Sequence, residues 1–392
     1  MIYDNKYISD KIKLKDQEFS ANDDEIKTKA NTDTDFSNLL LDSLSDLRNG
    51  IGESMKTDKI CFFMANGCSI YAGSNSIASG NVCTDELLDE FNLIEKDILK
   101  VKKASFEEQM NQLNVIKDYY QLFNEKEKLE QIGRYIEFKK KQLLNYFVYG
   151  LDYTKLTVHE IFMIKLRSFN AINKCNFFTP NYDLALEYTL DKIQEVYNNG
   201  FVGFINRKFD ISSFNSFHPN IVKIHGSLNW ILDDSTNELK EIQPLFKDGK
   251  IETDSLGKSI IYPSSQKLIQ TYDLPYSELL RYMLNTIQTG KNVIFVLGYK
   301  YGDSHINDVL LKGITNPNNI FYFFDFDNCK TNDFINKIKI LEQTLNNINI
   351  IQGHFLADFS IFVNYLMPSN DEKTDHEKIF GLLQKVLNDG KN

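Results

Sequence analysis

The sequence predicts an α/β protein with a doubly wound, mostly parallel sheet and an inserted helical subdomain. Short, continuous apolar runs recur along the chain, as expected of strands that are buried on both faces. Segments with apolar residues at helical spacing separate these runs. Because strands that alternate with helices are typical of doubly wound sheets, the pattern predicts a Rossmann-like arrangement.

The predicted strands are short and end in polar or turn-forming residues. They span 60–64, 175–178, 221–224, 259–262, 292–297, 320–324 and 348–351. The predicted helices span 182–197, 276–289, 304–313, 332–346 and 356–367. Residues 84–170 break the alternation, because Leu, Ile, Phe and Tyr recur there three or four apart among Lys and Glu. We interpret this block as a helical insertion between the first and second strands.

The two ends of the chain differ from the middle in composition. Residues 1–58 hold 8 Lys+Arg against 13 Asp+Glu, a difference of −5, which is half of the total charge of −10. Residues 15–35 lack periodicity and are expected to be flexible, whereas 36–47 predict one short helix that packs on the body or reaches a neighbouring subunit. We expect a polar extension over 1–58, the α/β domain over 59–370 and a charged C-terminal helix or tail over 371–392. Residues 201–258 are expected to be irregular.

Composition excludes several classes of protein. With 42% hydrophobic residues the chain can bury a core, and it has no apolar run of the ~20 residues that cross a bilayer. The start lacks a signal-peptide layout, and the acidic balance argues against nucleic acid held by bulk charge. The five cysteines are widely spaced without a Cys-x-x-Cys pair, and neither His225 nor His354 has a companion at ligand spacing. We therefore expect reduced cytoplasmic thiols and no metal site.

Three polar motifs each follow a predicted strand, at the edge of the sheet where open α/β proteins bind ligands. The first is Ala65-Asn66-Gly67-Cys68-Ser69, whose backbone N–H groups and Ser69 hydroxyl suit a phosphate. A tight turn that needs Gly67 for its backbone angles is the alternative. The second is Thr179-Pro180-Asn181-Tyr182-Asp183, in which Asp183 either caps the next helix or joins Asn181 in facing a ligand.

The third motif is Lys223-Ile224-His225-Gly226-Ser227. A lone histidine at a strand end is more often a satisfied structural group than a catalytic one. Gly226 and Ser227 leave the imidazole of His225 room beside a ligand, which is the functional interpretation.

Taken together, these motifs resemble the NAD-binding core of sirtuins. The likeness is greatest to the Sir2-type, NAD-hydrolysing effectors of prokaryotic antiphage defence. A fourth stretch, Gly298-Tyr299-Lys300-Tyr301-Gly302-Asp303, is similar to the turn that lines the adenosine side of the site in that family. The resemblance covers residues 59–365 and departs from the family where its Gly-Ala-Gly turn reads Ala65-Asn66-Gly67. The zinc module of the deacetylating members, with its two Cys-x-x-Cys pairs, has no counterpart, which favours NAD hydrolysis over deacylation.

The resemblance implies a role for each matching residue. Asn181 and His225 are the implied catalytic residues: Asn181 orients water or ribose, and His225 accepts a proton. Asp183 contacts the nicotinamide carboxamide, and the 65–67 backbone and Ser69 hold the phosphates. The implied NAD-binding residues are Ala65, Asn66, Gly67, Ser69, Thr179, Asp183, Gly226, Ser227, Gly298, Tyr299, Asp303 and Asp325.

The resemblance also implies partners. Stand-alone effectors of this kind pair with a HerA-type hexameric ATPase, so we expect a homo-oligomer and such a partner, with NAD as the substrate and no membrane or direct nucleic-acid contact. Three alternatives stay open. The first alternative is an NAD-dependent deacylase or ADP-ribosyltransferase, the second is a non-catalytic NAD-sensing subunit, and the third is a nuclease. The sequence has no clustered carboxylates that would bind the metal ions of a nuclease.

Overall fold

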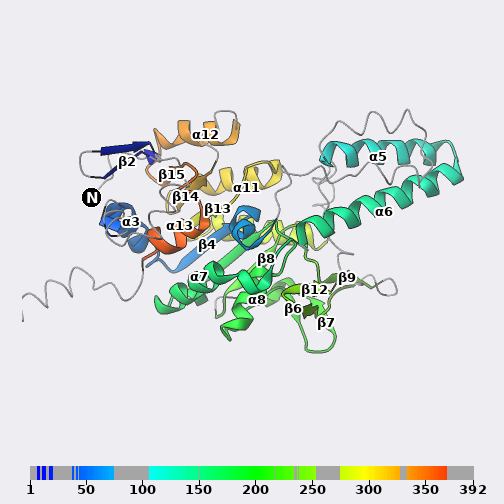
Figure 1. Ribbon diagram of the computed structural model, residues 1–392, viewed down its shortest axis with the longest axis horizontal. Coiled ribbons are helices and arrows are strands. Elements are labelled where there is room, and N and C mark those ends of the chain that lie inside the picture. The colour runs from blue at the N-terminus through cyan, green and yellow to red at the C-terminus, as the bar shows by residue number, and fades with distance from the viewer. Residues whose placement is uncertain are drawn as a thin grey trace, which may run out of the picture.

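The computed structural model describes residues 7–8, 11–14, 17–20, 38, 41–42, 44–74, 106–148, 150–215, 217–233, 236, 238–252, 274–326 and 333–368. Within these ranges a central parallel sheet is covered by helices on both faces, and a helical hairpin projects away from it (Figure 1). No helix of the described ranges is both long and apolar enough to cross a membrane.

The central sheet confirms the predicted fold class. Its strand order is β1-β15-β14-β13-β4-β5-β8, and every neighbouring pair is parallel. The strands are β1 Tyr7–Ile8, β4 Lys59–Met64, β5 Cys175–Thr179, β8 Asn220–Lys223, β13 Asn292–Leu297, β14 Ile320–Asp325 and β15 Ile348–Gln352. After β4 the chain builds outward through β5 to β8, then returns to the other side of β4 for β13. The strand order therefore reverses at β4, and ligands of such sheets bind at this reversal.

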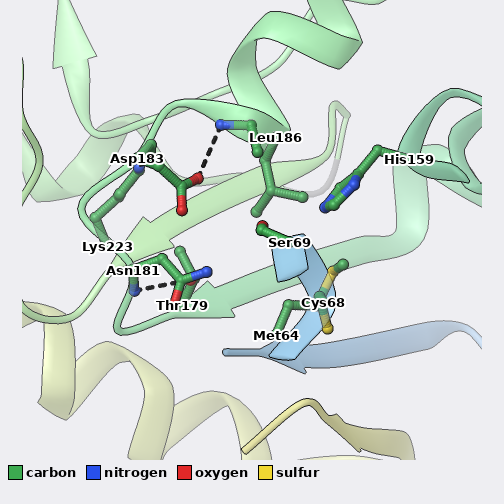
Figure 2. Close-up of a pocket in the computed structure, with 10 residues that line it drawn as sticks. Met64, Cys68, Ser69, His159, Thr179, Asn181, Asp183, Leu186 and Lys223 are labelled. Atoms are coloured by element: carbon green, nitrogen blue, oxygen red, sulfur yellow. Dashed lines mark hydrogen bonds between the residues drawn. The ribbon is translucent and has the colours of Figure 1, made fainter. Parts of the chain in front are cut away.

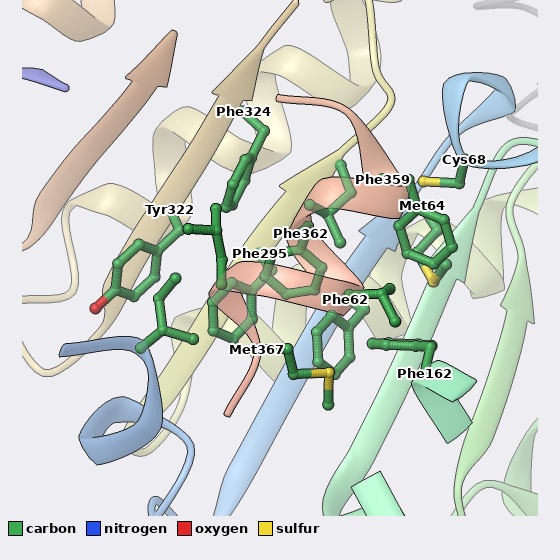
Figure 3. Packing of buried hydrophobic residues seen from close by; sticks show 14 of the residues in the cluster. Phe62, Met64, Cys68, Phe162, Phe295, Tyr322, Phe324, Phe359, Phe362 and Met367 are labelled. Atoms are coloured by element: carbon green, nitrogen blue, oxygen red, sulfur yellow. The ribbon is translucent and has the colours of Figure 1, made fainter. Parts of the chain in front are cut away.

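The strands are apolar throughout because both faces of the sheet are buried. Alternate residues enter different clusters: Phe62 packs in one core and Phe63 in the other. In the first core, the ring of Phe62 stacks on Phe295 with 5.1 Å between centroids and meets the edge of Phe162 at 5.0 Å (Figure 3). This regular alternation is why the short apolar runs could be recognised as strands.

Helices cover the two faces. The first core is closed by α3 Ser45–Ser54, α7 Thr157–Ser168 and α13 Phe359–Ile361, which a π-helical turn, Phe362–Leu366, continues. The second core is closed by α10 Tyr276–Gln288, α11 Ser304–Ile314 and α12 Asp333–Glu342. Helix α8, Ala185–Lys192, follows β5. Each falls within or beside a predicted helix, except that α3 begins later than the predicted 36–47.

The described part of the insertion between β4 and β5, from residue 106 onward, is mainly helical, as predicted. Helices α5 Phe106–Leu122 and α6 Lys126–Val148 form a hairpin that extends from the sheet (Figure 1). Met110, Leu113 and Ile136 belong to a core of its own. Helix α7 then brings the chain back to the sheet.

Two expectations about irregular segments are wrong. Residues 201–258 contain an antiparallel sheet of β6 Phe201–Val202, β7 Arg207–Phe209, β10 Leu239–Glu241 and β9 Trp230–Leu232, and a hairpin of β11 Leu245–Lys247 and β12 Lys250–Glu252. Strands of two or three residues are too short to show a period, and pairing with a neighbour creates them. An ion pair of 2.5 Å between Arg207 Nε and Glu241 Oε2 joins β7 to β10.

The stretch expected to be flexible, 15–35, is also partly ordered. Strand β3 Gln17–Ser20 pairs with β2 Lys11–Leu14 in an antiparallel hairpin. The predicted strand at 259–262 and the C-terminal tail at 371–392 lie outside the described residues.

The turns that follow β4 and β13 touch through their backbones. The N–H of Gly67 donates to the carbonyl oxygen of Gly298 at 3.0 Å, and Gly298 has a φ of +63°. A Cβ placed on Gly67 would lie 2.6 Å from the Cα of Gly298, a distance that real Cβ contacts do not reach. The turn after β4 therefore needs glycine at position 67 for packing.

Replacing Gly67 by alanine should separate the two turns and destabilise the protein by about 1–3 kcal/mol, the usual cost of overpacking a close contact. The matched control is Gly133→Ala in α6, where a Cβ would meet nothing within 4 Å. That change should stabilise the helix by about 0.5–1 kcal/mol. Chemical denaturation of both variants measures the difference, and equal stability of the two would refute the packing role of Gly67.

Candidate active site

A small pocket opens where the turns after β4 and β5 and the end of β8 come together. Its empty volume is about 240 Å³. The lining residues come from β4, β5, α7, α8 and β8 or from the turns after β4 and β5, and they are Met64, Cys68, Ser69, His159, Thr179, Asn181, Asp183, Ala185, Leu186 and Lys223 (Figure 2). Of the residues singled out in the sequence, Ser69, Thr179, Asn181 and Asp183 meet here.

The loop after β5 supplies a carboxamide to the pocket. The backbone N–H of Asn181 donates to the hydroxyl of Thr179 at 3.0 Å, which fixes the start of the loop (Figure 2). The side chain of Asn181 is half-buried and makes no hydrogen bond to any described residue. Its amide and carbonyl groups are therefore available to a bound molecule.

Asp183 serves two purposes that the sequence presented as alternatives. One carboxylate oxygen, Oδ1, accepts a hydrogen bond from the N–H of Ala185 at 3.0 Å and so supports the start of α8. The same half-buried side chain lines the pocket. Supporting the helix orients the carboxylate toward the cavity.

A buried ion pair lies behind the loop, and sequence reasoning did not assign it to the site. The Nζ of Lys223 lies 3.3 Å from Oε1 of Glu187, and both side chains are at most 9% exposed. The ammonium group also donates to the backbone carbonyl of Asp183. Burial raises the pKa of Glu187, against the opposing charge of Lys223. Lys223 thus ties the loop after β5 to the end of β8, where it also lines the pocket.

His159, from α7, faces the pocket from the side opposite Asp183 and Lys223 (Figure 2). Burial lowers the pKa of His159 to about 3, so the imidazole is neutral at pH 7. The hydroxyl of Tyr71 accepts the backbone N–H of His159 at 3.1 Å, and it lies 2.7 Å from Nδ1. The Tyr71 hydroxyl either donates to Nδ1 or accepts from it, and the tautomer of the ring decides which. A lone histidine in a helical pattern carried no signal that could have identified it.

The turn after β4 departs from the expected phosphate cradle. The N–H groups of Ala65 and Gly67 donate to the carbonyls of Leu297 and Gly298, both at 3.0 Å. The side-chain oxygen of Asn66 accepts a hydrogen bond of 2.6 Å from the Ser74 hydroxyl. Two of the backbone donors assigned to phosphate are therefore engaged in holding the turn, and Cys68 and Ser69 are the members of this motif that line the pocket.

His225 is not one of the residues that line this pocket. It is 2% exposed, and its Nε2 atom lies 2.9 Å from Nε2 of His305 on α11. Gly226 has a φ of +88°, and the hydroxyl of Ser227 donates to Asn229 Oδ1 at 2.8 Å. His225 has no companion at ligand spacing in the sequence, yet the fold places His305, 80 positions away, beside it.

The remaining candidates lie at the ends of β13 and β14. The hydroxyl of Tyr299 accepts the N–H of Asp303 at 3.0 Å, which closes the turn before α11. Gly298 supports the contact with Gly67. The carboxylate of Asp325 is buried and accepts a hydrogen bond from the side chain of Gln352, so it joins β14 to β15. These residues do not line the pocket, and their role in binding stays a prediction.

The depressed pKa of His159 predicts acid sensitivity. The unfolded chain binds the proton below the ordinary pKa of 6.5 and the folded one only near 3. The stability is therefore complete above pH 6.5 and is lost as the pH falls, by up to about 1.4 kcal/mol per pH unit. His159→Asn keeps an acceptor for Tyr71 but cannot titrate, so its stability should fall less between pH 7 and 5. Denaturation midpoints of wild type and variant between pH 7 and 5 measure this difference in stability. Parallel curves of midpoint against pH for the two proteins would rule out the buried neutral histidine.

Comparison with known proteins adds a family likeness. No curated protein matches the chain in sequence. Among solved structures, the chain is similar to a Sir2 homologue in complex with NAD, at 12% identity and a TM-score of 0.42, over 81% of this chain and 93% of that one. It is also similar to a mutant Sir2 homologue with ADP-ribose, at 11% identity and a TM-score of 0.37, over 81% and 95% of the two chains. A family model described as a SIR2-like domain matches residues 176–343, the part of the chain that runs from β5 into α12.

Proposed function

We propose that this protein hydrolyses NAD⁺ to nicotinamide and ADP-ribose. The observation that carries the proposal is the side chain of Asn181, which makes no hydrogen bond to a described residue and lines the pocket at the carboxyl edge of the sheet. The motif around it belongs to the segment that matches the SIR2-like domain. Asp183 and Ser69 line the same pocket.

The chemistry of the reaction fits the groups in this pocket. Cleavage of the nicotinamide–ribose bond builds positive charge on the ribose carbon, while the pyridinium departs as a neutral molecule. The leaving group needs no proton, so the site needs positioned dipoles, a nearby negative charge and a placed water rather than an acid. A carboxamide and a carboxylate on one loop meet these needs.

Each polar group then has a proposed task. Asn181 orients the attacking water or the ribose through its carboxamide, and Asp183 accepts a hydrogen bond from the nicotinamide amide. When Tyr71 donates to Nδ1, the neutral His159 carries its proton on Nε2 and offers a donor to the substrate. The nicotinamide end of the dinucleotide is proposed to bind beside the loop that carries Asn181 and Asp183, and the turns after β13 and β14 take the other end.

His225 is the proposed acceptor of the proton from water or a ribose hydroxyl. Its imidazole is already hydrogen-bonded to His305, so one ring donates and the other accepts. We propose that Nε2 of His225 is the accepting atom. This arrangement makes His305 the donor in the resting site.

The test is the fate of NAD⁺ incubated with purified full-length protein and separated by liquid chromatography. Wild type should release nicotinamide and ADP-ribose, and Asn181→Ala or His225→Ala should abolish the release. The matched controls are Asn318→Ala, in the loop before β14, and His218→Ala, in the loop before β8, because both lie at the opposite edge of the sheet. Equal NAD⁺ loss by wild type and Asn181→Ala would overturn the proposal.

The same assay separates hydrolysis from deacylation. With an acyl-lysine peptide added, a deacylase couples NAD⁺ loss to removal of the acyl group and forms an acylated ADP-ribose. We expect the peptide to stay acylated and NAD⁺ loss to be independent of it. Peptide-dependent NAD⁺ consumption would assign the pocket to a deacylase instead.

We extend the proposal to a role as an antiphage effector that works as a homo-oligomer, with a HerA-type ATPase as the partner. The sequence resemblance supports this role. Helix α5 and the turn after it carry four exposed apolar side chains that suit a subunit contact, namely Val115, Tyr119, Leu122 and Phe123. Light scattering at micromolar concentration should give a mass that is a multiple of 45.5 kDa. A monomer would refute the homo-oligomer.

A further inference from the structure

Three side chains that can bind a metal ion meet beside the end of β8. They are His225, Asp303 and His305, and each offers one ligand atom within 4.8 Å of the others. His225 follows β8, whereas Asp303 and His305 stand at the start of α11, after β13. Two separate crossovers of the sheet therefore bring them together at its carboxyl edge.

The two imidazoles already face each other in a suitable way. Their Nε2 atoms are 2.9 Å apart and their ring planes are inclined by 47°. Zinc binds imidazole nitrogen at about 2.0–2.1 Å, which puts two nitrogens of a tetrahedral site about 3.3 Å apart. A small rotation of the two rings is enough to admit the ion. Both rings are at most 6% exposed, so the strands and helices around them restrict larger movements.

The carboxylate of Asp303 completes the set. Asp303 is the residue that precedes α11, yet its side chain makes no capping hydrogen bond to the helix. Capping is the common role of aspartate at this position. The carboxylate lies within 4.8 Å of a ring nitrogen of each imidazole, and Asp303 is partly exposed.

Two imidazoles and one carboxylate select a class of ion. Imidazole nitrogen suits Zn²⁺ and the other divalent first-row transition metals, whereas Mg²⁺ and Ca²⁺ prefer oxygen ligands. Three protein ligands leave one tetrahedral position for water.

We propose that His225, Asp303 and His305 form a binding site for a divalent transition-metal ion, represented by Zn²⁺, and that the bound ion inhibits the enzyme. The inhibitory part rests on the proposed NAD⁺ hydrolysis. An ion on Nε2 of His225 occupies the lone pair with which that nitrogen would accept a proton. Metal binding and catalysis by His225 therefore exclude each other.

Direct binding tests the site without reference to activity. The full-length chain is freed of metal with a chelator, and Zn²⁺ is titrated in competition with a chromogenic chelator. Wild type should bind about one equivalent. His305→Ala and Asp303→Asn should each weaken binding by more than the roughly 10–100-fold that the loss of an outer-shell partner costs. His305→Asn, which keeps a polar group beside His225, is the second variant if His305→Ala does not fold. The control His218→Ala should bind Zn²⁺ as wild type does.

Cobalt distinguishes this site from one built on cysteine. Co²⁺ bound by nitrogen and oxygen shows visible d–d bands without the near-ultraviolet charge-transfer band of thiolate ligands. The proposed ligand set contains no cysteine, so Co²⁺ bound at this site should show no thiolate band. A thiolate band, or binding that His305 and Asp303 variants leave unchanged, would overturn the proposed site.

Activity then tests the inhibition. One equivalent of Zn²⁺ should suppress NAD⁺ hydrolysis by wild type, and a chelator should restore the activity. In His305→Asn, the ratio of the hydrolysis rates with and without Zn²⁺ should approach one. Stoichiometric Zn²⁺ binding by a protein that leaves NAD⁺ intact would keep the site and refute the proposed function. Hydrolysis that one equivalent of bound Zn²⁺ does not suppress would refute the inhibition alone.

Discussion

The contact between Gly67 and Gly298 fixes the geometry on which the rest of the site depends. It joins the turn after β4 to the turn after β13, the two strands that flank the reversal of the sheet. Neither position can carry a side chain, since a Cβ on Gly67 would lie 2.6 Å from Gly298 Cα and one on Gly298 would lie 2.5 Å from Cys68 N. With these turns joined, Ser69 is directed into the pocket, and the chain after Gly298 leads directly to Asp303 and His305. One backbone contact thus sets both the proposed substrate pocket and the proposed metal site.

Electrostatics around the pocket is set by burial. The cation of Lys223 and the carboxyl of Glu187 lie beneath the loop that carries Asn181 and Asp183, and His159 is kept neutral opposite them. A buried ion pair adds little stability by itself, because the desolvation of both charges offsets their attraction. Its effect here is positional, since the ammonium of Lys223 also holds the carbonyl of Asp183. The loop is therefore held in place before a ligand arrives, as a site built from dipoles requires.

The sequence predicted the central sheet well and its surroundings less well. Buried parallel strands are apolar at every position, so runs such as 60–64 and 292–297 were recognisable, and the structure confirms them as β4 and β13. The antiparallel sheet formed by β6, β7, β9 and β10 was missed because its strands are short and partly exposed. Pairing with neighbours defines them, as the ion pair of Arg207 with Glu241 shows.

For the site, the sequence by itself determined which polar residues follow which strand, and hence that Ser69, Asn181 and Asp183 would share one edge of the sheet. This inference holds because parallel strands place all their carboxyl ends together. Only the tertiary structure decided that the N–H groups of Ala65 and Gly67 are engaged by the neighbouring turn, and that His159 reaches the pocket. It also decided that His225 meets His305. Such contacts join residues from different crossovers, and their spacing in the sequence contains no information about their distance in space.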